Sequence, residues 1–267
     1  MARFGFIGIG NMGGAIASAV AKVVAPEEIL VAAKHPERAA AFAETLGCTA
    51  VSNEAAAEHA KFVVLGVKPQ FMEEVLSGLK PILALRQDVV LVTMAAGLTM
   101  ANIEAMAGGE FPVIRIMPNT PAQIGKGVIL YDANERVKDA DLKEFLAALS
   151  PAGMLDRLPE KLIDAGSALA GSGPAYVSMF MEALADGGVA CGLPRDKALQ
   201  YAAQTLIGTA ELMLRSGKHP GEMKDAVCSP GGSTIQGVSA LEKGGMRGTV
   251  MDAVAAAYRK NLEFIKK

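Results

Sequence analysis

The chain has 267 residues, of which 51% are hydrophobic and 20% charged, and its formal net charge is −2. This balance is typical of a folded protein with a well-buried core, and it argues against disorder and against nucleic acid or an anionic membrane as a partner. Aromatic residues make up only 5% and tryptophan is absent, which argues against a base-stacking surface.

Strand-like runs alternate with helical patterns in the first half of the chain. The runs are FGFIGI, EILVAA, KFVVLGV, VVLVTMA, PVIRIM and GVILYD. Nearly continuous apolar strands separated by helices predict an α/β domain with a parallel sheet that is buried on both faces. A charged helix over 135–150 and a short GMLDRL segment follow, and the strand signals stop after Pro159. We therefore predict one domain over 1–158 and an all-helical domain over 159–267.

A glycine-rich turn follows the first predicted strand and opens a helix. Residues 8–13 spell GxGxxG, and this position between strand and helix is the context that a dinucleotide-binding fingerprint requires. Gly8 would permit the tight turn, Gly10 would let a pyrophosphate approach the backbone, and Gly13 would let the helix pack on the strand. Free N–H groups at the helix start, at Asn11 and Met12, would meet the anion. The turn predicts a Rossmann-type dinucleotide-binding domain; a turn without a ligand is the alternative.

The end of the second predicted strand bears on which dinucleotide binds. When NAD is the cofactor, this strand normally ends in an acid that binds the ribose 2′-hydroxyl. Here the sequence is AAKHPER, with no acid before Glu37. Lys34, His35 and Arg38 cluster there instead, and cations favour a 2′-phosphate. We expect NADPH, with NADH as an alternative cofactor and a solvated basic loop as the alternative structure.

Further strand ends should line the same crevice, because ligands bind at the carboxyl edge of such sheets. The small residues over 95–97, at one of these strand ends, would let a nicotinamide ribose come close. The segment over 117–121 (MPNTP) is a weaker candidate, and an ordinary turn is the alternative for each segment. The expected cofactor contacts at these strand ends are Val67, Lys68, Pro69, Ala95, Ala96 and Gly97.

The cysteines and the first residues indicate the compartment. Cys48, Cys191 and Cys228 form no metal-binding spacing with the three histidines, so no metal site is expected. A sparse, odd set of cysteines suits a reducing cytosol. The chain opens with a strand pattern instead of a signal peptide, and its longest uncharged runs are shorter than a membrane span. We expect a cytoplasmic protein without a membrane segment.

The opening GFIGIGNMG also suits the β-hydroxyacid dehydrogenases, which resemble this chain in plan. That family places a catalytic lysine in the first interdomain helix, in a pattern like GxGxxxK. The matching stretch begins at Gly171, and Val177 stands where the lysine would be. An alcohol dehydrogenase needs a group that takes or gives the hydroxyl proton, so this hypothesis lacks its base. A nucleotide-bound protein without catalysis is a further alternative.

Several blocks together resemble the pyrroline-5-carboxylate reductases across nearly the whole chain. They are GFIGIGNMGGAI, VKPQ, RIMPNTP, ALAGSGPAYVSMFMEALADGGVACGLPR, QTLIGTAELM and CSPGGSTIQGVSALEKGGMRG. The resemblance implies reduction of 1-pyrroline-5-carboxylate to L-proline with NAD(P)H. It also implies a Rossmann-type domain followed by a helical dimerisation domain that interlocks with a partner subunit, in a homodimer or a higher homo-oligomer such as a ring of dimers.

The resemblance assigns roles to residues in two turns. It implies a cofactor contact at Asn53, in the VSNEA turn, and substrate contacts in the SPGGST loop. The implied substrate-binding residues are Ser229, Gly231, Gly232, Ser233 and Thr234.

The chemistry of this substrate agrees with the residues present. A protonated cyclic imine accepts hydride directly, so the reaction needs positioning and an anion holder more than a strong base. Gly231 and Gly232 can form a nest of N–H donors, and the helix that begins near Ser233 adds its positive end. We therefore expect this backbone to bind the substrate carboxylate, with the Thr234 hydroxyl as the candidate catalytic group near the ring nitrogen. Plain capping of the helix by Ser233 or Thr234 is the alternative.

Overall fold

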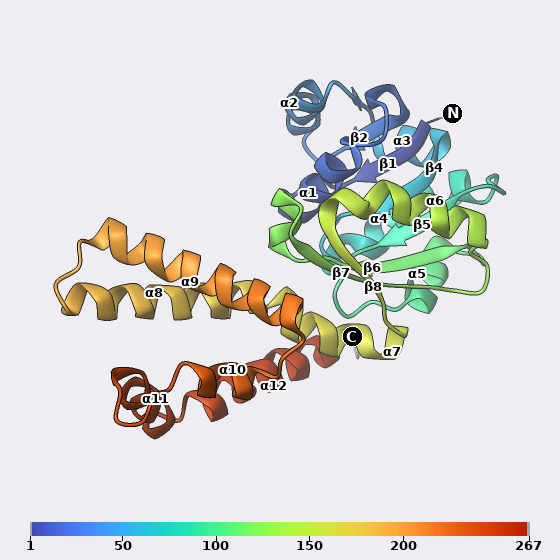
Figure 1. Ribbon diagram of the computed structural model, residues 1–267. Helices are drawn as coiled ribbons and strands as arrows, with labels where there is room; N and C mark the ends of the chain where they lie inside the picture. Colours follow the sequence, from blue (N-terminus) through green and yellow to red (C-terminus); the bar gives the residue numbers. More distant parts are fainter. Residues whose placement is uncertain (1, 266–267) are drawn as a thin grey trace. The chain divides into compact units, whose positions relative to one another are not determined.

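The computed structural model describes residues 2–265, which form two compact units (Figure 1). Unit 1 holds the described residues up to Ser172 and those from Ala257 onward, and unit 2 holds Gly173–Ala256. Unit 1 is an α/β unit and unit 2 is helical, as the sequence predicted.

Unit 1 is built on one mixed sheet. Within residues 2–265 the strand order is β3-β2-β1-β4-β5-β6-β7-β8. Strands β1 to β6 run parallel in the order of a doubly wound dinucleotide-binding fold. The strands are β1 (Ala2–Ile7), β2 (Ile29–Ala32), β3 (Thr49–Ala50), β4 (Ala60–Leu65), β5 (Val90–Thr93), β6 (Val113–Met117), β7 (Gly127–Ala133) and β8 (Gly153–Arg157).

Strand β7 departs from the predicted parallel sheet. It pairs antiparallel with β6, with Met117 opposite Leu130, and β8 then runs parallel to β7. The prediction of a parallel sheet is therefore wrong at this edge. The connection over 118–126 contains only the short 3₁₀ turn η3 (Thr120–Ile124). A parallel crossover needs about a dozen residues or more, usually with a helix, so the chain turns back instead.

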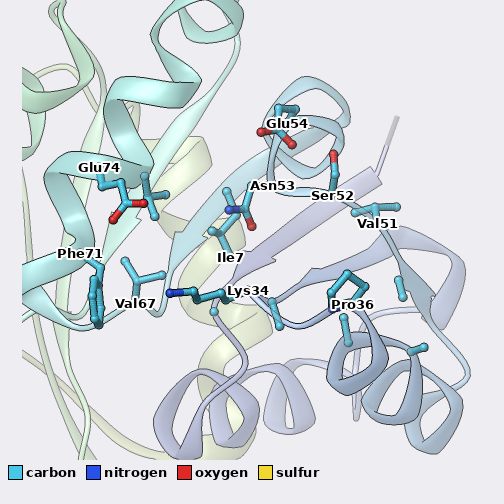
Figure 2. Close-up of a pocket in the computed structure, with 16 residues that line it drawn as sticks. Ile7, Lys34, Pro36, Val51, Ser52, Asn53, Glu54, Val67, Phe71 and Glu74 are labelled. Carbon is cyan, nitrogen blue, oxygen red and sulfur yellow. The ribbon is translucent and has the colours of Figure 1, made fainter.

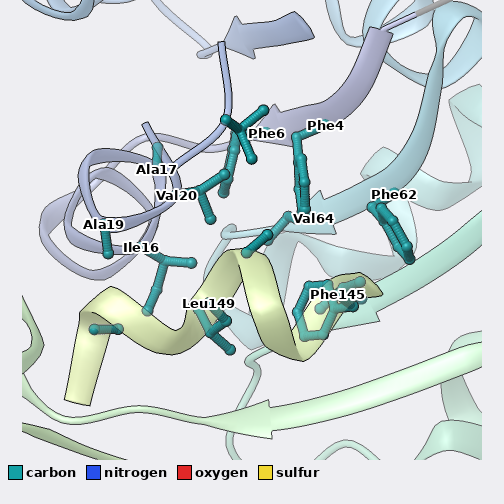
Figure 3. Close-up of a cluster of buried hydrophobic side chains, with 14 of the residues drawn as sticks. Phe4, Phe6, Ile16, Ala17, Ala19, Val20, Phe62, Val64, Phe145 and Leu149 are labelled. Carbon is teal, nitrogen blue, oxygen red and sulfur yellow. The ribbon is translucent and has the colours of Figure 1, made fainter. Parts of the chain in front are cut away.

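Helices cover both faces of the sheet. Consecutive strand residues point to opposite faces, so Val64 packs with α1 and α6 whereas Val63 packs with α3, α4 and α5. Figure 3 shows the first face, where the ring of Phe62 lies 5.1 Å from that of Phe4 and 5.5 Å from that of Phe145. The helices of this unit are α1 (Asn11–Val20), α2 (Pro36–Leu46), α3 (Asn53–His59), α4 (Met72–Leu83), α5 (Met100–Ala107), α6 (Asp139–Leu149) and α7 (Glu160–Gly166).

The compact units divide later in the chain than the predicted boundary at residue 158. Helix α7 packs on the sheet, because Ile163 forms a small apolar cluster with Met117 and Leu130. The end of the last helix also belongs to unit 1, where Asn261 Nδ2 donates to the carbonyl of Asp164 at 3.0 Å. Helical residues beyond 158 are thus anchored on the α/β unit at both ends of the helical region.

Unit 2 has almost no core of its own. Its helices are α8 (Gly173–Ala190), α9 (Arg195–Ser216), α10 (Pro220–Ala226), α11 (Ser233–Lys243) and the start of α12 (Met246–Ile265). Helices α8 and α9 lie side by side (Figure 1) and pack through Ala185, Ala198 and Ala202. Many large apolar side chains of this unit are exposed in the single chain. They include Val177, Met179, Leu184, Leu199, Tyr201, Ile207, Leu212, Leu214, Val250 and Met251.

None of the helices in the part of the chain that the structure describes combines the length and the apolar character that crossing a membrane would require.

Candidate functional site

The glycine-rich turn between β1 and α1 has the geometry that the fingerprint predicts. Gly8 has φ +95, a conformation that side chains rarely adopt. A Cβ on Gly13 would lie 2.0 Å from the carbonyl oxygen of Gly8, so helix and strand approach backbone to backbone. Gly66, at the end of β4, is as tightly placed, since its Cβ would lie 2.2 Å from the same oxygen. Gly66 lies outside the GxGxxG motif, and its place directly after an apolar strand is the only sequence signal for its role.

The start of α1 is open to an anion. Gly10 is the N-cap, no side chain caps the helix, and a Cβ on Gly10 would meet nothing within 4 Å. The N–H groups of Asn11 and Met12 have no partner within the helix. The backbone here can therefore bind a phosphate group, because nothing in the described chain occupies these donors.

A cavity of about 740 Å³ lies where β1, β2 and β4 end (Figure 2). It brings together four of the predicted cofactor residues from four chain segments, namely Gly8, Lys34, Asn53 and Val67. Figure 2 shows Lys34 extending toward Phe71 and Val67, with Asn53 above Lys34 in this view. Other residues that line the cavity were not predicted from the sequence, and they include Pro36, Ser52, Glu54, Phe71 and Glu74.

The polar groups of this cavity are held by local contacts. Lys34 Nζ lies 5.8 Å from the centroid of the Phe71 ring. Ser52 caps α3 by accepting from the N–H of Ala55 at 3.2 Å. The backbone N–H of Glu54 and the Ser52 hydroxyl lower the pKa of the Glu54 carboxyl, so this carboxyl is ionised at neutral pH. The cavity thus presents a cation on one side and an acid at the helix start on the other.

A second, smaller cavity of about 290 Å³ lies beside the glycine-rich turn. Gly10, Asn11 and Arg38 line it, together with Gln123. Lys34 and Arg38 therefore face different cavities, although they are four residues apart. His35 lines neither, and its Nδ1 lies 3.6 Å from Glu37 Oε1 in an exposed pair. The structure separates the three basic residues that the sequence groups together.

The remaining predicted cofactor residues do not line either cavity. Lys68 and Pro69 lie where the 3₁₀ turn η2 (Pro69–Phe71) begins. Ala95 is buried, its N–H lies 3.3 Å from Thr93 Oγ1, and Gly97 has φ +72. A cofactor contact at Lys68, Pro69, Ala95, Ala96 or Gly97 stays a prediction.

In unit 2 the SPGG segment forms a tight turn just before α11. The N–H of Gly232 donates to the carbonyl of Ser229 at 3.0 Å, and Gly231 has φ +70. Proline at the second position and a left-handed glycine at the third are the pattern of a type II turn. Gly231 is exposed, and a Cβ there would meet no neighbour within 4 Å, so the glycine serves the backbone conformation and not close packing.

Helix α11 begins at Ser233 with Gly232 as its N-cap, and no side chain caps it. The capping alternative for Ser233 and Thr234 is therefore wrong. Both residues are exposed, and among the described residues the Thr234 hydroxyl has no hydrogen-bond partner. The first N–H groups of the helix are unbonded within it, which makes this turn a second place where an anion can be held.

Other chemically active side chains have structural partners. His219 Nδ1 accepts from the N–H of Gly221 at 3.1 Å and so caps α10. Asp186 forms an ion pair with Arg195. Within residues 2–265 no group of three or more His, Cys, Asp or Glu side chains is placed to hold a metal ion.

Comparison with known proteins gives consistent matches over both units. A family model described as pyrroline-5-carboxylate reductase dimerisation matches residues 160–264, and one described as NADP oxidoreductase, coenzyme F420-dependent, matches residues 3–97. The chain is 44% identical to pyrroline-5-carboxylate reductase of Pisum sativum over 262 residues, covering 97% of this chain and 94% of that protein. It is 37% identical to the Escherichia coli (strain K12) protein of that name, covering 99% and 98% of the two chains.

Among solved structures, that of Plasmodium falciparum pyrroline carboxylate reductase with NADP bound superposes with a TM-score of 0.90. It shares 32% identity, and the match covers 99% of this chain and 98% of that chain.

Proposed function

We infer the function from one premise: the chain belongs to the pyrroline-5-carboxylate reductase family. The protein reduces 1-pyrroline-5-carboxylate to L-proline by hydride transfer from NADPH, which is the last step of proline biosynthesis. The observation that carries this conclusion is the 44% identity to a reductase of this name over 97% of the chain.

The SPGG turn and the start of α11 are proposed to hold the substrate carboxylate. The left-handed Gly231 turns the backbone so that Gly232 begins α11 with no side-chain cap. The N–H groups of Ser233 and Thr234 are then free to donate to two carboxylate oxygens, and the positive end of the helix adds to the attraction. The segment over 229–235 carries no charged side chain, so nothing there repels the anion. Ser229 contributes through its carbonyl, which closes the turn.

Thr234 is proposed to act on the ring nitrogen. Its hydroxyl is exposed and uncommitted among the described residues, so it is free to accept from a protonated imine and to donate to the product amine. Protonation makes the imine carbon electrophilic enough to accept hydride, so a strong base is not required. The role of Thr234 is to keep the iminium charge and the ring in place during the transfer.

The residues of unit 1 fit a dinucleotide that supplies the hydride when bound. The uncapped start of α1, with open space at Gly10, suits a pyrophosphate on the N–H groups of Asn11 and Met12. The adjoining cavity, with Asn53 and Val67 in its walls, has the size of a ligand site. We propose that Lys34 and Arg38 favour the 2′-phosphate of NADPH over the free hydroxyl of NADH. We also propose that the bound dinucleotide contacts His35, Lys68, Pro69 and the residues over 95–97.

The chain works as a homo-oligomer. Its helical region matches the dimerisation family model, and unit 2 leaves large apolar side chains exposed in the single chain. Surfaces of this kind are covered by a second copy in symmetric oligomers. A cytoplasmic location is proposed from the three unpaired cysteines, which suit a reducing compartment.

Initial rates with the cyclic imine test this function. Purified protein is mixed with 1-pyrroline-5-carboxylate and either NADPH or NADH, the loss of nicotinamide absorbance is followed, and proline is identified as product. We expect turnover with NADPH and a lower kcat/KM with NADH. Turnover of a hydroxy acid with NAD, and none of the imine with either cofactor, would instead support the dehydrogenase hypothesis.

A further inference from the structure

A π-helical turn precedes the point where the chain leaves unit 1. This turn, η5 (Ser167–Gly171), connects α7 to the start of α8. The N–H of Ser172 donates to the carbonyl of Ser167, five residues earlier, at 3.1 Å, which is the spacing of a π-helix. Single π-turns inside α-helices are rare and occur frequently at functional sites.

Pro174 accounts for the turn. In an α-helix the carbonyl of residue 170 would accept from the N–H of residue 174, but proline has no N–H, and its ring clashes with the carbonyl four residues before it. A widened turn relieves the clash. It does not supply the donor that the carbonyl of Ala170 has lost.

Asn119 supplies that donor. Its Nδ2 donates to the carbonyl of Ala170 at 3.0 Å, and its Oδ1 accepts from the N–H of Val128 at 2.9 Å. The side chain is only 7% exposed, so both ends of the amide are committed inside unit 1. Asn119 lies two residues after the end of β6, at the carboxyl edge of the sheet where dinucleotide-binding folds place their ligands.

We propose that Asn119 is a positioning residue of the reductase, which holds the π-turn required by Pro174 and so fixes the backbone from which α8 begins. The inference rests on the proposed function. The cofactor is assigned to unit 1 and the substrate turn to unit 2, and the π-turn lies in unit 1 directly before the first of the two points where the chain passes from one unit to the other. Asn119 acts on hydride transfer through the carbonyl of Ala170 and does not itself touch the substrate.

The chain offers a matched control for this residue. Asn134 makes two hydrogen bonds of the same kind with other partners. Its Nδ2 donates to the carbonyl of Phe111 at 2.9 Å, and its Oδ1 accepts from the N–H of Val113 at 3.1 Å. These bonds lie at the opposite end of β6 from Asn119. Asn134→Ala removes equivalent hydrogen bonds without altering the π-turn.

The experiment compares five full-length proteins: wild type, Asn119→Ala, Asn134→Ala, Pro174→Ala and the Asn119→Ala/Pro174→Ala double variant. Tm is measured for each, with kcat and KM for imine and NADPH. We expect both asparagine variants to have a lower Tm. Asn119→Ala should also lose about tenfold or more in kcat, because small misplacements of reacting groups are costly, while KM for NADPH changes little. Asn134→Ala should keep the wild-type kcat.

Pro174→Ala separates stability from positioning. With Asn119 present it should keep most of the wild-type kcat, because the carbonyl of Ala170 is still held by the amide. In the double variant, the N–H of the new alanine can bond to Ala170, so Tm should recover toward that of Pro174→Ala while kcat stays low.

Four results would overturn the proposal. A wild-type kcat in Asn119→Ala, or recovery of kcat together with Tm in the double variant, would make Asn119 merely stabilising. Failure of Tm to recover would show that the Ala170 carbonyl is not what Asn119 serves. A Pro174→Ala protein as slow as the double variant would assign the effect to the proline.

If Asn119→Ala does not fold, the double variant is compared with Pro174→Ala instead. A lower kcat in the double variant at a similar Tm supports the proposal, and an equal kcat in the two proteins overturns it. If the wild type itself does not reduce the imine, the proposed function fails, whereas the Tm comparison still tests the bond between Asn119 and Ala170.

Discussion

Asp164 Oδ1 of α7 lies 2.9 Å from Arg115 Nη2 of β6, and the two side chains are only 6% and 1% exposed. Glu160 Oε1 lies 3.5 Å from the other terminal nitrogen of Arg115. Arg115 Nε has no hydrogen-bond partner among residues 2–265. Asp164 is therefore the main counter-charge of a buried guanidinium, and the pair fastens α7 to strand β6.

Asp164→Ala should destabilise the protein strongly, because it leaves the charge of Arg115 buried with only Glu160 nearby. Breaking a buried pair by removing one partner costs about 3 kcal/mol or more in free energy of unfolding. Urea unfolding measures the change. Glu211→Ala is the control, because it breaks the exposed pair with Arg215 on α9, where no measurable change is expected. Equal stability of the two variants would show that the buried pair does not anchor α7.

Gly231→Ala should raise KM for the imine and destabilise unit 2. The left-handed φ of +70 at this position costs a non-glycine residue about 1–2 kcal/mol, and the turn will shift to avoid it. Gly237→Ala, in the interior of α11, is the matched control and should increase stability by about 0.5–1 kcal/mol. If Gly231→Ala binds the imine as tightly as wild type, the turn does not hold the carboxylate.

Substitution of both Lys34 and Arg38 by alanine should weaken NADPH binding about tenfold or more and affect NADH far less, because only NADPH carries the 2′-phosphate. Dissociation constants for both cofactors provide the test. Lys143→Ala, an exposed lysine on α6 that lines neither cavity, should change neither constant. The single variants are informative as well, since the two cations face different cavities. Equal losses for the two cofactors would show that these cations do not recognise the phosphate.

Thr234→Ala should lower kcat more than it raises KM, because the hydroxyl is proposed to act chiefly in the transition state. Thr234→Ser keeps the hydroxyl and should retain most of the wild-type kcat. Ser233→Ala removes the neighbouring hydroxyl and should leave kcat within about twofold of wild type, because Ser233 contributes its backbone N–H. A Thr234→Ala enzyme with wild-type kcat would exclude the proposed role of the hydroxyl.

The sequence predicted those parts of the fold that local patterns determine. The apolar runs that became β1, β2 and β4 to β7 are long enough to read directly, whereas β3 has two residues and β8 is largely exposed. The antiparallel direction of β7 depends on the length of the connection over 118–126, which a strand pattern does not show. Gly8 and Gly13 were predictable because the turn itself requires them.

The rest of the site depends on contacts between distant segments. Phe71 and Glu74 enter the first cavity from the segment after β4, and no pattern in their own neighbourhood marks them. Lys34 precedes α2 whereas Arg38 lies in its first turn, and the two residues line different cavities, which their spacing in the sequence does not show. The bond from Asn119 to Ala170 joins residues that are 51 positions apart, so the sequence around GSGP could indicate a helix break but not the side chain that holds it.

A crystal structure of the protein with NADP⁺ and L-proline tests the central claim most directly. We predict that the proline carboxylate accepts hydrogen bonds from the N–H groups of Ser233 and Thr234, with the ring nitrogen near the Thr234 hydroxyl. Proline bound elsewhere, with the turn over 229–234 free of any ligand, would contradict this account.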